Sequence, residues 1–233
     1  IKCGSYTGNG NVAGPLVDVG FEPQFVLIKA ASRTGHWFLL DVMRGIITGT
    51  SDSSPGSNQY LLANSSGAEG TTTSINVNST GFQPRTSDDA VNENSATYIY
   101  VAIRRPMKTP EAGTEVFTVA RGDSSGDPEF ISGFPVDFAF YKDVDHTANW
   151  DVGARIIAKT TMHFNATTAE TGFTPFMFDY QNGVIDGAFS SDFYAWIFKR
   201  ATGFFDVVVA TPSGYAWSNV PHNLGVTPEL LIY

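Results

Sequence analysis

The chain has 233 residues, of which 42% are hydrophobic and 13% aromatic, so it can bury one or two hydrophobic cores of ordinary size. Its formal net charge is −9 with only 14 lysine and arginine residues. This balance argues against nucleic-acid binding, because no basic stripe can neutralise phosphates. The one cysteine, Cys3, excludes an intrachain disulfide and is predicted to be a small apolar core or edge residue. No apolar run approaches the ~18 residues of a membrane span, and the first residues do not resemble a signal peptide, so we expect no membrane insertion.

The first part of the chain reads as short strands separated by turns. A strand beginning at Gly4 gives way by Gly10 to residues that tolerate positive φ. The turn Gly20–Pro23 leads into an apolar, β-branched run, and a second apolar run follows a small polar turn, which predicts a hairpin. The predicted strands here are residues 25–29, 37–40, 60–62, 74–77, 80–82 and 98–104, and the predicted loops are 48–56, 64–73 and 85–95.

A proline-containing segment, residues 106–113, separates this part from the next. Pro106 and Pro110 fix φ and remove two donors from any strand ladder, while the polar residues between them offer nothing to a core. We therefore expect an extended linker at 106–113, with one unit at residues 1–105, a second at 114–200 and the start of a third at 201–233.

The two units share a motif without a gap. Residues 20–37 (GFEPQFVLIKAASRTGHW) match residues 133–150 (GFPVDFAFYKDVDHTANW). The last ten residues of the chain, LGVTPELLIY, repeat the first part of this motif. Matched pairs are Gly20 with Gly133, Phe21 with Phe134, Phe25 with Phe138, Lys29 with Lys142, Thr34 with Thr147 and Trp37 with Trp150. Because Trp and Phe dominate core burial, we expect the matched Trp and Phe residues to face inward and the two units to superpose. The chain lacks an initial Met and ends within the third copy, so it is interpreted as a piece of a longer protein.

The second unit adds predicted strands at residues 116–120, 138–142 and 193–200, and a third copy would begin with a strand at 205–210. Helix signals are weak, with at most a helical turn within 42–48 and 152–160. About seven or eight short strands per unit of about 100 residues is the pattern of a Greek-key or jelly-roll β-sandwich. The sequence therefore predicts an all-β fold, a tandem repeat of such sandwich units.

The stretches 4–10 and 20–29, followed by Trp37, Asp41, Arg44 and Gly45, resemble a β domain repeated in bacteriophage tail and tail-fibre proteins, notably those of marine phages. Further marks are residues 60–64, Glu69, 81–82, the strand 98–105 and the segment 105–117. The resemblance is strong over residues 4–120 and weak in the second unit, which lacks in-register counterparts of Asp41, Arg44 and Gly45.

This resemblance implies a non-enzymatic structural and receptor-recognition segment of a tail fibre or tail appendage, located in the virion and extracellular. The implied partners are a host cell-surface glycan or protein, other tail proteins, and other copies of the chain in a homo-oligomer, a trimer by analogy with the family. It supplies no catalytic residues, and no cofactor is expected. The alternative from another class is a bacterial extracellular adhesin or filament subunit.

Three local patterns bear on catalysis or receptor binding. Residues 122–126 (GDSSG) match the G-x-S-x-G pattern of a serine nucleophile elbow, but a strand start follows where a helix is required, which favours a plain turn. Arg121-Gly122-Asp123 spells an integrin-type tripeptide, which is short enough to match by chance. Carboxylates that cleave a glycoside must face each other across a sugar, whereas Asp88, Asp89 and Glu93 lie in one loop. A polysaccharide depolymerase spike is therefore only the third function considered.

Asp143, Asp145 and His146 are the candidate metal ligands, because carboxylates at alternate positions of a turn can converge on a hard cation. The first unit has no matching carboxylates, so the site would belong to the second unit alone. The competing interpretation is a solvated acidic turn. No spacing of Cys or His suits zinc.

Recognition is expected in loops that differ between the units, since a rigid scaffold presents loops to partners. The candidates are Asp179, Tyr180, Gln181 and Asn182 in the second unit, with Asn182-Gly183 as a tight hairpin turn, and Tyr215 and Trp217 in the third. An aromatic ring flanked by Asp, Asn and Gln can hold a sugar. Alternatively, Tyr180 and Trp217 pack into a neighbouring unit or chain.

Overall fold

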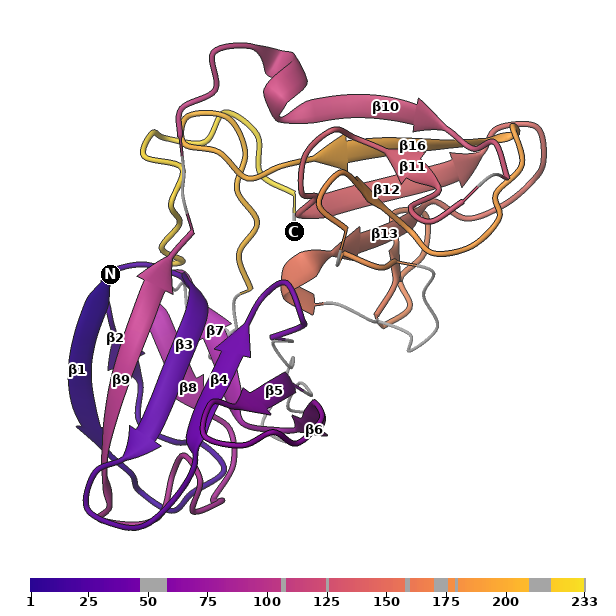
Figure 1. Cartoon of the computed structure of the whole chain (residues 1–233). Coiled ribbons are helices and arrows are strands. Elements are labelled where there is room, and N and C mark those ends of the chain that lie inside the picture. The colour runs from indigo at the N-terminus through magenta and orange to yellow at the C-terminus, as the bar shows by residue number, and fades with distance from the viewer. Residues whose placement is uncertain are drawn as a thin grey trace. The chain divides into compact units, whose positions relative to one another are not determined.

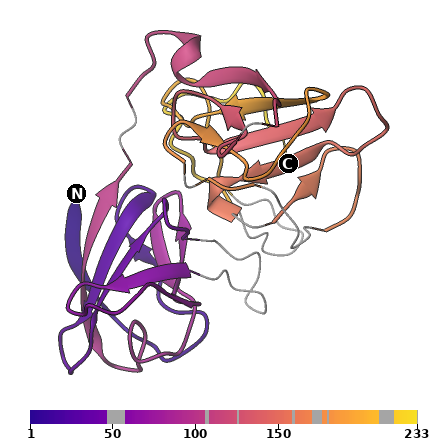
Figure 2. The same cartoon turned by 45° about the vertical axis from the view of Figure 1, so that its right-hand side comes forward.

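The computed structural model describes residues 1–46, 58–105, 108–124, 126–157, 160–169, 176–178, 180–209 and 219–232 (Figures 1 and 2). The chain divides into two compact units. Unit 1 is Ile1–Pro106 with Val208–Asn223, and unit 2 is Met107–Val207 with Leu224–Tyr233. Both are built from antiparallel sheets, which confirms the all-β sandwich class predicted from the sequence. No helix among the described residues is long and apolar enough to cross a membrane.

Unit 1 contains a six-stranded and a three-stranded sheet. The six strands lie in the order β1 (Lys2–Thr7), β9 (Thr97–Arg104), β3 (Pro23–Ala30), β4 (Trp37–Asp41), β5 (Asn58–Leu62) and β6 (Gly70–Thr72). The three lie in the order β2 (Val17–Asp18), β8 (Gly81–Pro84) and β7 (Ile75–Asn78), behind the larger sheet in Figure 1. The predicted hairpin is β3–β4. The prediction of a loop at 64–73 is wrong for Gly70–Thr72, because these residues form the edge strand β6 and pair with β5.

The core of unit 1 lies between its two sheets. Along β3, Val26, Ile28 and Ala30 are buried, while the residues between them are partly exposed. The fully buried ring of Phe82 in β8 contacts Tyr6 and Tyr100 of the larger sheet edge-on, with centroids 5.9 Å and 5.4 Å apart. Full burial of a side chain this size contributes about 1.5–3 kcal/mol, so Phe82 is one of the residues that hold the two sheets together.

Unit 2 contains a five-stranded and a two-stranded sheet. The five strands lie in the order β10 (Phe117–Arg121), β16 (Phe193–Phe198), β12 (Phe138–Asp143), β13 (Asp151–Ala154) and β14 (Met162–His163). The small sheet pairs β11 (Phe130–Ile131) with β15 (Gly183–Val184), and two short 3-10 helices are η1 (Gly113–Glu115) and η2 (Arg155–Ile157). The core is Phe130, Phe134, Val136, Ala139, Tyr141, Phe176, Phe178, Val184, Ile185, Ala195 and Ile197.

The larger sheets of the two units have the same strand order over five strands: β1, β9, β3, β4 and β5 occupy the places of β10, β16, β12, β13 and β14. Gly20, Gly133 and Gly225 also share a left-handed φ of 80°, 79° and 79°, which side chains with a Cβ rarely adopt. The tandem repeat stays a prediction, and these two features support it.

The expectation that the matched aromatic residues face the core is wrong for Trp37, Trp150, Phe25 and Phe138, whereas Phe134 is buried in the core of unit 2. Trp37 is 37% exposed, Trp150 is partly exposed, and Phe25 and Phe138 lie on the opposite side of their strands from the buried residues. The side-chain period of a strand is two, so Phe25 and Lys29 share one face and the core takes the other. The cross-strand partner of Lys29 is Trp37, which is therefore on the outer face as well.

Other segments agree with the sequence expectation in part. The stretch expected to allow a helical turn at 152–160 begins as strand β13 and continues as η2, with residues 158–159 outside the described part. Residues 205–209 form no strand beyond one bridge between Ala201 and Phe205. In the linker, Pro110 lies in no strand, and the Lys108 ammonium contacts the Glu111 carboxylate at 2.7 Å. Pro106 lies outside the described residues, as does the predicted loop 48–56. Cys3 is exposed on the edge strand β1.

Candidate functional site

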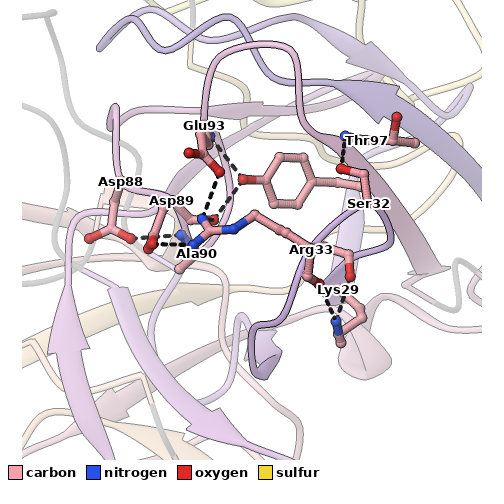
Figure 3. Close-up of polar contacts among 10 residues, drawn as sticks. Lys29, Ser32, Arg33, Asp88, Asp89, Ala90, Glu93 and Thr97 are labelled. Carbon is pink, nitrogen blue, oxygen red and sulfur yellow. Dashed lines mark hydrogen bonds and ion pairs between the residues drawn. The ribbon is translucent and has the colours of Figure 1, made fainter.

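The acidic loop of unit 1, residues 85–95, is held by one arginine from the turn after β3. The Arg33 guanidinium contacts the Asp89 carboxylate at 2.6 Å and the Glu93 carboxylate at 2.8 Å, and it donates to the Asp89 carbonyl at 3.0 Å (Figure 3). Arg33 and Asp89 are 56 positions apart in the chain, so only the fold brings them together.

The electrostatics of this loop do not suit acid catalysis. The hydrogen bond from Arg33 holds the pKa of Asp89 below its ordinary value, and the same bond raises the pKa of Arg33. A glycosidase acid needs the opposite, a carboxyl whose pKa is raised so that it keeps its proton near neutral pH. The two carboxylates also share one cation, whereas catalysis requires them on either side of a sugar. The loop is therefore an ion-paired structural element.

Buried side chains fix the backbone of the same loop. The hydroxyl of Tyr98, a fully buried side chain, donates to the Asp89 carbonyl at 2.6 Å and accepts from the Glu93 amide at 2.9 Å. The Asn92 side chain, also fully buried, donates to the carbonyls of Asn11 and Thr86 at 2.8 Å each. These bonds pin the loop to the sandwich at several points.

An open depression of ≈ 90 Å³ lies beside this loop, and we call it the Phe38–Tyr60 pocket. The rings of Phe38 and Tyr60 stack with centroids 4.8 Å apart and form its apolar part. Asp88 supplies a carboxylate whose Oδ1 accepts from the Ala90 amide at 2.8 Å. The lining residues are Phe38, Tyr60, Thr72, Thr73, Ser74, Thr86, Asp88, Ala90 and Val91. Ring surface, hydroxyls and one carboxylate are the groups that contact the C–H and O–H groups of a polyol.

Sequence reasoning missed this pocket, although it singled out Asp88. Phe38 and Tyr60 come from neighbouring strands, and their contact depends on the register that places Tyr60 opposite Leu40 and Leu62 opposite Phe38. No local signal in the sequence specifies that register.

The metal candidates of unit 2 form a turn cap. Asp143 Oδ1 accepts from the amides of Asp145 and His146 at 3.0 and 2.9 Å, and the His146 ring lies 3.1 Å from Oδ2. Among the described residues no group of three His, Cys, Asp or Glu side chains is placed to hold a metal ion. Asp143, Asp145 and His146 are thus not brought together as three ligands, because Asp143 is bonded to the turn itself.

Of the recognition candidates, Tyr180 is half-buried and Gln181 and Asn182 are exposed, whereas Asp179, Tyr215 and Trp217 lie outside the described residues. The Asn182 carbonyl accepts from the amides of Ser132 and Gly133 at 2.8 and 3.1 Å. Gly183 begins β15, and neither Asn182 nor Gly183 has a positive φ, so the tight hairpin turn is wrong. Pairing with β11 extends the chain there instead.

The described residues of the G-x-S-x-G stretch, 122–124 and 126, lie between β10 and β11. The Ser124 amide donates to the Phe189 carbonyl and to the Glu129 carboxylate, both at 3.0 Å. The short strand β11 follows, and not the helix of a nucleophile elbow. Arg121, the first residue of the integrin-type tripeptide, donates through Nε to the Ser191 carbonyl and lies over the Tyr194 ring at 5.5 Å.

Three residues that mark the resemblance form an ion-paired turn after β4. Arg44 contacts Asp41 at 2.6 Å and Glu69 at 3.2 Å and donates to the Leu39 carbonyl at 3.3 Å. These contacts tie β4 to the segment before β6. Their role in unit 1 is therefore structural.

The fold defines a class of molecule, a two-unit all-β sandwich chain with a small pocket in unit 1. Residues 1–106 match a family described as a domain of unknown function (DUF7483). No curated protein and no solved structure matches the chain. The matched family corresponds closely to the part of unit 1 that precedes the linker, and its description carries no activity.

Proposed function

We propose that the chain is a non-enzymatic structural and receptor-recognition segment of a phage tail fibre or related tail appendage, which attaches to a glycan or protein on the host-cell surface. The observation that carries the recognition role is the Phe38–Tyr60 pocket beside a loop pinned by Arg33 and Tyr98. The phage assignment rests on the resemblance of residues 4–120.

The chemistry of the pocket favours a sugar. Its ≈ 90 Å³ has room for about three water molecules, and hence for part of one sugar residue, such as a hydroxymethyl or acetyl group. Asp88 and the threonine hydroxyls would bond the sugar hydroxyls, and the rings would contact its C–H groups. One such site binds weakly, so useful affinity requires several copies acting together, as in a homo-oligomeric appendage.

The alternatives use the same groups differently. A bacterial adhesin or filament subunit would also need a pinned loop and a sugar pocket, and it differs in where the chain is displayed. A depolymerase would need Asp89 or Glu93 free from Arg33, which their ion pairs disfavour.

The test is a panel of bacterial surface polysaccharides probed with the full chain. We expect Asp88→Ala and Tyr60→Ala to reduce binding at least tenfold, with folding checked by circular dichroism. Tyr60→Phe keeps the stack and removes only the hydroxyl, and Asp145→Ala in the exposed turn of unit 2 is the matched control. Unchanged binding in both alanine variants, or release of reducing ends from the bound polysaccharide, would overturn the proposal. Antibodies against the chain should label the tail in electron micrographs of phage particles; labelling of bacterial surface filaments would favour the adhesin.

A further inference from the structure

The side chains that line the Phe38–Tyr60 pocket carry oxygen atoms and no nitrogen. Their polar groups are hydroxyls and the Asp88 carboxylate. A carboxylate only accepts hydrogen bonds, whereas a hydroxyl donates one and accepts two. The Ser74 hydroxyl donates its proton to Asn58 Oδ1 at 2.9 Å, so toward a ligand it can only accept. Acceptors therefore outnumber donors among the lining side chains.

Several backbone amides of the lining residues already donate within the protein. The Ser74 amide donates to Asn58 Oδ1 at 3.1 Å, and the Asp88 amide donates to the Thr86 hydroxyl at 3.0 Å. The Ala90 amide donates to Asp88 Oδ1 at 2.8 Å. These amides do not offset the excess of acceptors, because their hydrogens are used inside unit 1.

The charge of Asp88 is not neutralised within the described part of the chain. The Arg33 guanidinium is shared by Asp89 and Glu93, at 2.6 Å and 2.8 Å (Figure 3). The buried Arg85 does not line the pocket. No ion pair joins Asp88 to a described residue, so one carboxylate lines the pocket without a paired cation.

We infer that the pocket takes the ammonium group of an amino sugar, so that a free amine is the feature that it recognises in a surface glycan. This inference rests on the proposed function and names the class of sugar. An ammonium group has three donors and no acceptor, which complements a pocket rich in acceptors. Its hydrogen bond to the Asp88 carboxylate is charge-assisted and hence stronger than a bond between neutral groups. Aromatic ring faces also attract cations, so Phe38 and Tyr60 are compatible with this ligand.

Other sugar substituents fit the pocket less well. A carboxylate or phosphate group brings acceptors and a negative charge, and it would meet Asp88 without a cation between them. A neutral hydroxyl or acetamido group leaves the Asp88 charge unpaired. The volume of ≈ 90 Å³ has room for about three water molecules, which suffices for an ammonium group and the carbon that bears it. The net charge of −9 also favours the approach of a cationic glycan.

The experiment is an NMR titration of the full, ¹⁵N-labelled chain with two tetrasaccharides of the same linkage, one of glucosamine and one of N-acetylglucosamine. We expect the glucosamine tetrasaccharide to bind about tenfold more tightly, because it adds a charge-assisted bond. The shifted amides should include those of Asp88 and Ala90, and added salt should weaken the preference by screening the charges.

The decisive variant is Asp88→Asn, which keeps the size of the side chain and removes its charge. It should abolish the preference for glucosamine and leave the affinity for the N-acetylated tetrasaccharide nearly unchanged. Asp145→Asn removes the same charge from an exposed turn of unit 2 and is the matched control, which should retain the preference. The amide spectrum of each variant shows whether it is folded.

The outcomes separate this inference from the proposed function. Equal affinity for the two tetrasaccharides, no shift of pocket amides with the glucosamine tetrasaccharide, or tighter binding of an oligomer of galacturonic acid would overturn the amino-sugar inference. A preference that Asp145→Asn reduces as much as Asp88→Asn would also overturn it, because the cause would be the overall charge of the chain. The proposed function would stand in each case if the polysaccharide panel shows binding that Asp88→Ala and Tyr60→Ala reduce, and it fails only if the panel does not.

Discussion

The central hairpins of the two units close in the same way. The Lys29 ammonium bonds the turn carbonyls of Ala30 and Arg33, and Lys142 bonds those of His146 and Ala148. The Trp37 amide donates to the Asn64 side chain and the Trp150 amide to the Asn165 side chain, both at 3.0 Å. The matched Lys and Trp positions therefore secure a turn and an adjacent strand end, and they do not build the core.

The units differ just after the second strand of the hairpin. The same backbone bond recurs, from Val42 to the Gln24 carbonyl at 2.9 Å in unit 1 and from Arg155 to the Asp137 carbonyl at 2.8 Å in unit 2. Unit 1 adds the partly exposed Asp41, Arg44 and Glu69 cluster there. Unit 2 instead buries Asp137, 1% exposed, between Arg155 and Arg200. The same backbone arrangement is thus compatible with a partly exposed ion-pair cluster in unit 1 and with a buried one in unit 2.

The largest effect is expected from removing the buried acid of unit 2. Asp137→Ala removes the carboxylate that Arg155 and Arg200 share, although Arg200 keeps its contact with Asp206 at 3.9 Å. Breaking a buried pair in this way costs about 3–5 kcal/mol. Gln24→Ala, at the matched position of unit 1, is the control and should cost far less. Hydrogen-exchange mass spectrometry should show faster exchange throughout unit 2 and none of that loss in unit 1. If Asp137→Ala and Gln24→Ala changed the stability of their units equally, the buried ion pairs of Asp137 would contribute nothing special to unit 2.

A second difference lies inside the hairpin, where unit 2 has Gly153 and unit 1 has the fully buried Leu40. The Phe176 ring fills the space, since a Cβ on Gly153 would lie 2.6 Å from it. Gly153→Ala overpacks this core and should cost about 1–3 kcal/mol in denaturant unfolding of unit 2. Gly126→Ala, which meets nothing within 4 Å, is the control. A neutral Gly153→Ala would show that Phe176 moves freely.

A smaller effect is expected at the acidic loop of unit 1, because exposed ion pairs contribute little. Arg33→Ala should speed amide exchange in residues 85–95 without a measurable change in global stability. The pKa of Asp89 is lowered in the folded state, so the stabilisation is present above its ordinary pKa of about 3.9 and is lost as the pH falls through the folded value. Parent and variant should therefore converge in acid, and a difference that persists there would contradict the assignment.

The smallest effect is expected at an exposed acidic pair of unit 2. The pKa of Asp186 is raised by its hydrogen bond with Asp127 and by the charge of that residue. A raised carboxyl pKa destabilises the fold above the folded pKa, and the penalty disappears as the pH falls toward the unfolded value. Asp186→Asn should slightly raise the melting temperature at pH 7 and have no advantage in acid, measured by calorimetry. Asp145→Asn is the control, and a loss of stability at pH 7 would refute the repulsion.

Much of the secondary structure could be predicted, because its signals are local. The predicted hairpin strands 25–29 and 37–40 are β3 and β4, and the run 98–104 is β9, since apolar and β-branched runs bounded by turns leave little alternative. The short strand β2 and the polar strand β6 were missed. Pairing with β8 and β5 makes them strands, and two or three residues carry no period of their own.

The candidate site was predictable only in part. Asp88, Asp89 and Glu93 were identified as a group, but Arg33 lies 56 positions away from Asp89 and nothing in its own turn signals the contact. The Phe38–Tyr60 pocket depends on the register of β4 and β5. The Asp143 turn was seen as an acidic cluster, and only its backbone bonds distinguish a turn cap from a metal site.

The sequence by itself determined the β class, the turn at Gly20 and its matched glycines, and strands β3, β4 and β12 of the central hairpins, because alternation and turn chemistry act over a few residues. The tertiary structure alone decided which side of each sheet became the core. Phe25 and Val26 point to opposite faces of the strand and are both apolar, so the sequence pattern does not show which face is buried. Packing of Phe82 from the second sheet against Tyr6 and Tyr100 fixed the side of Val26 as the interior of unit 1, and the same choice left Trp37 outside.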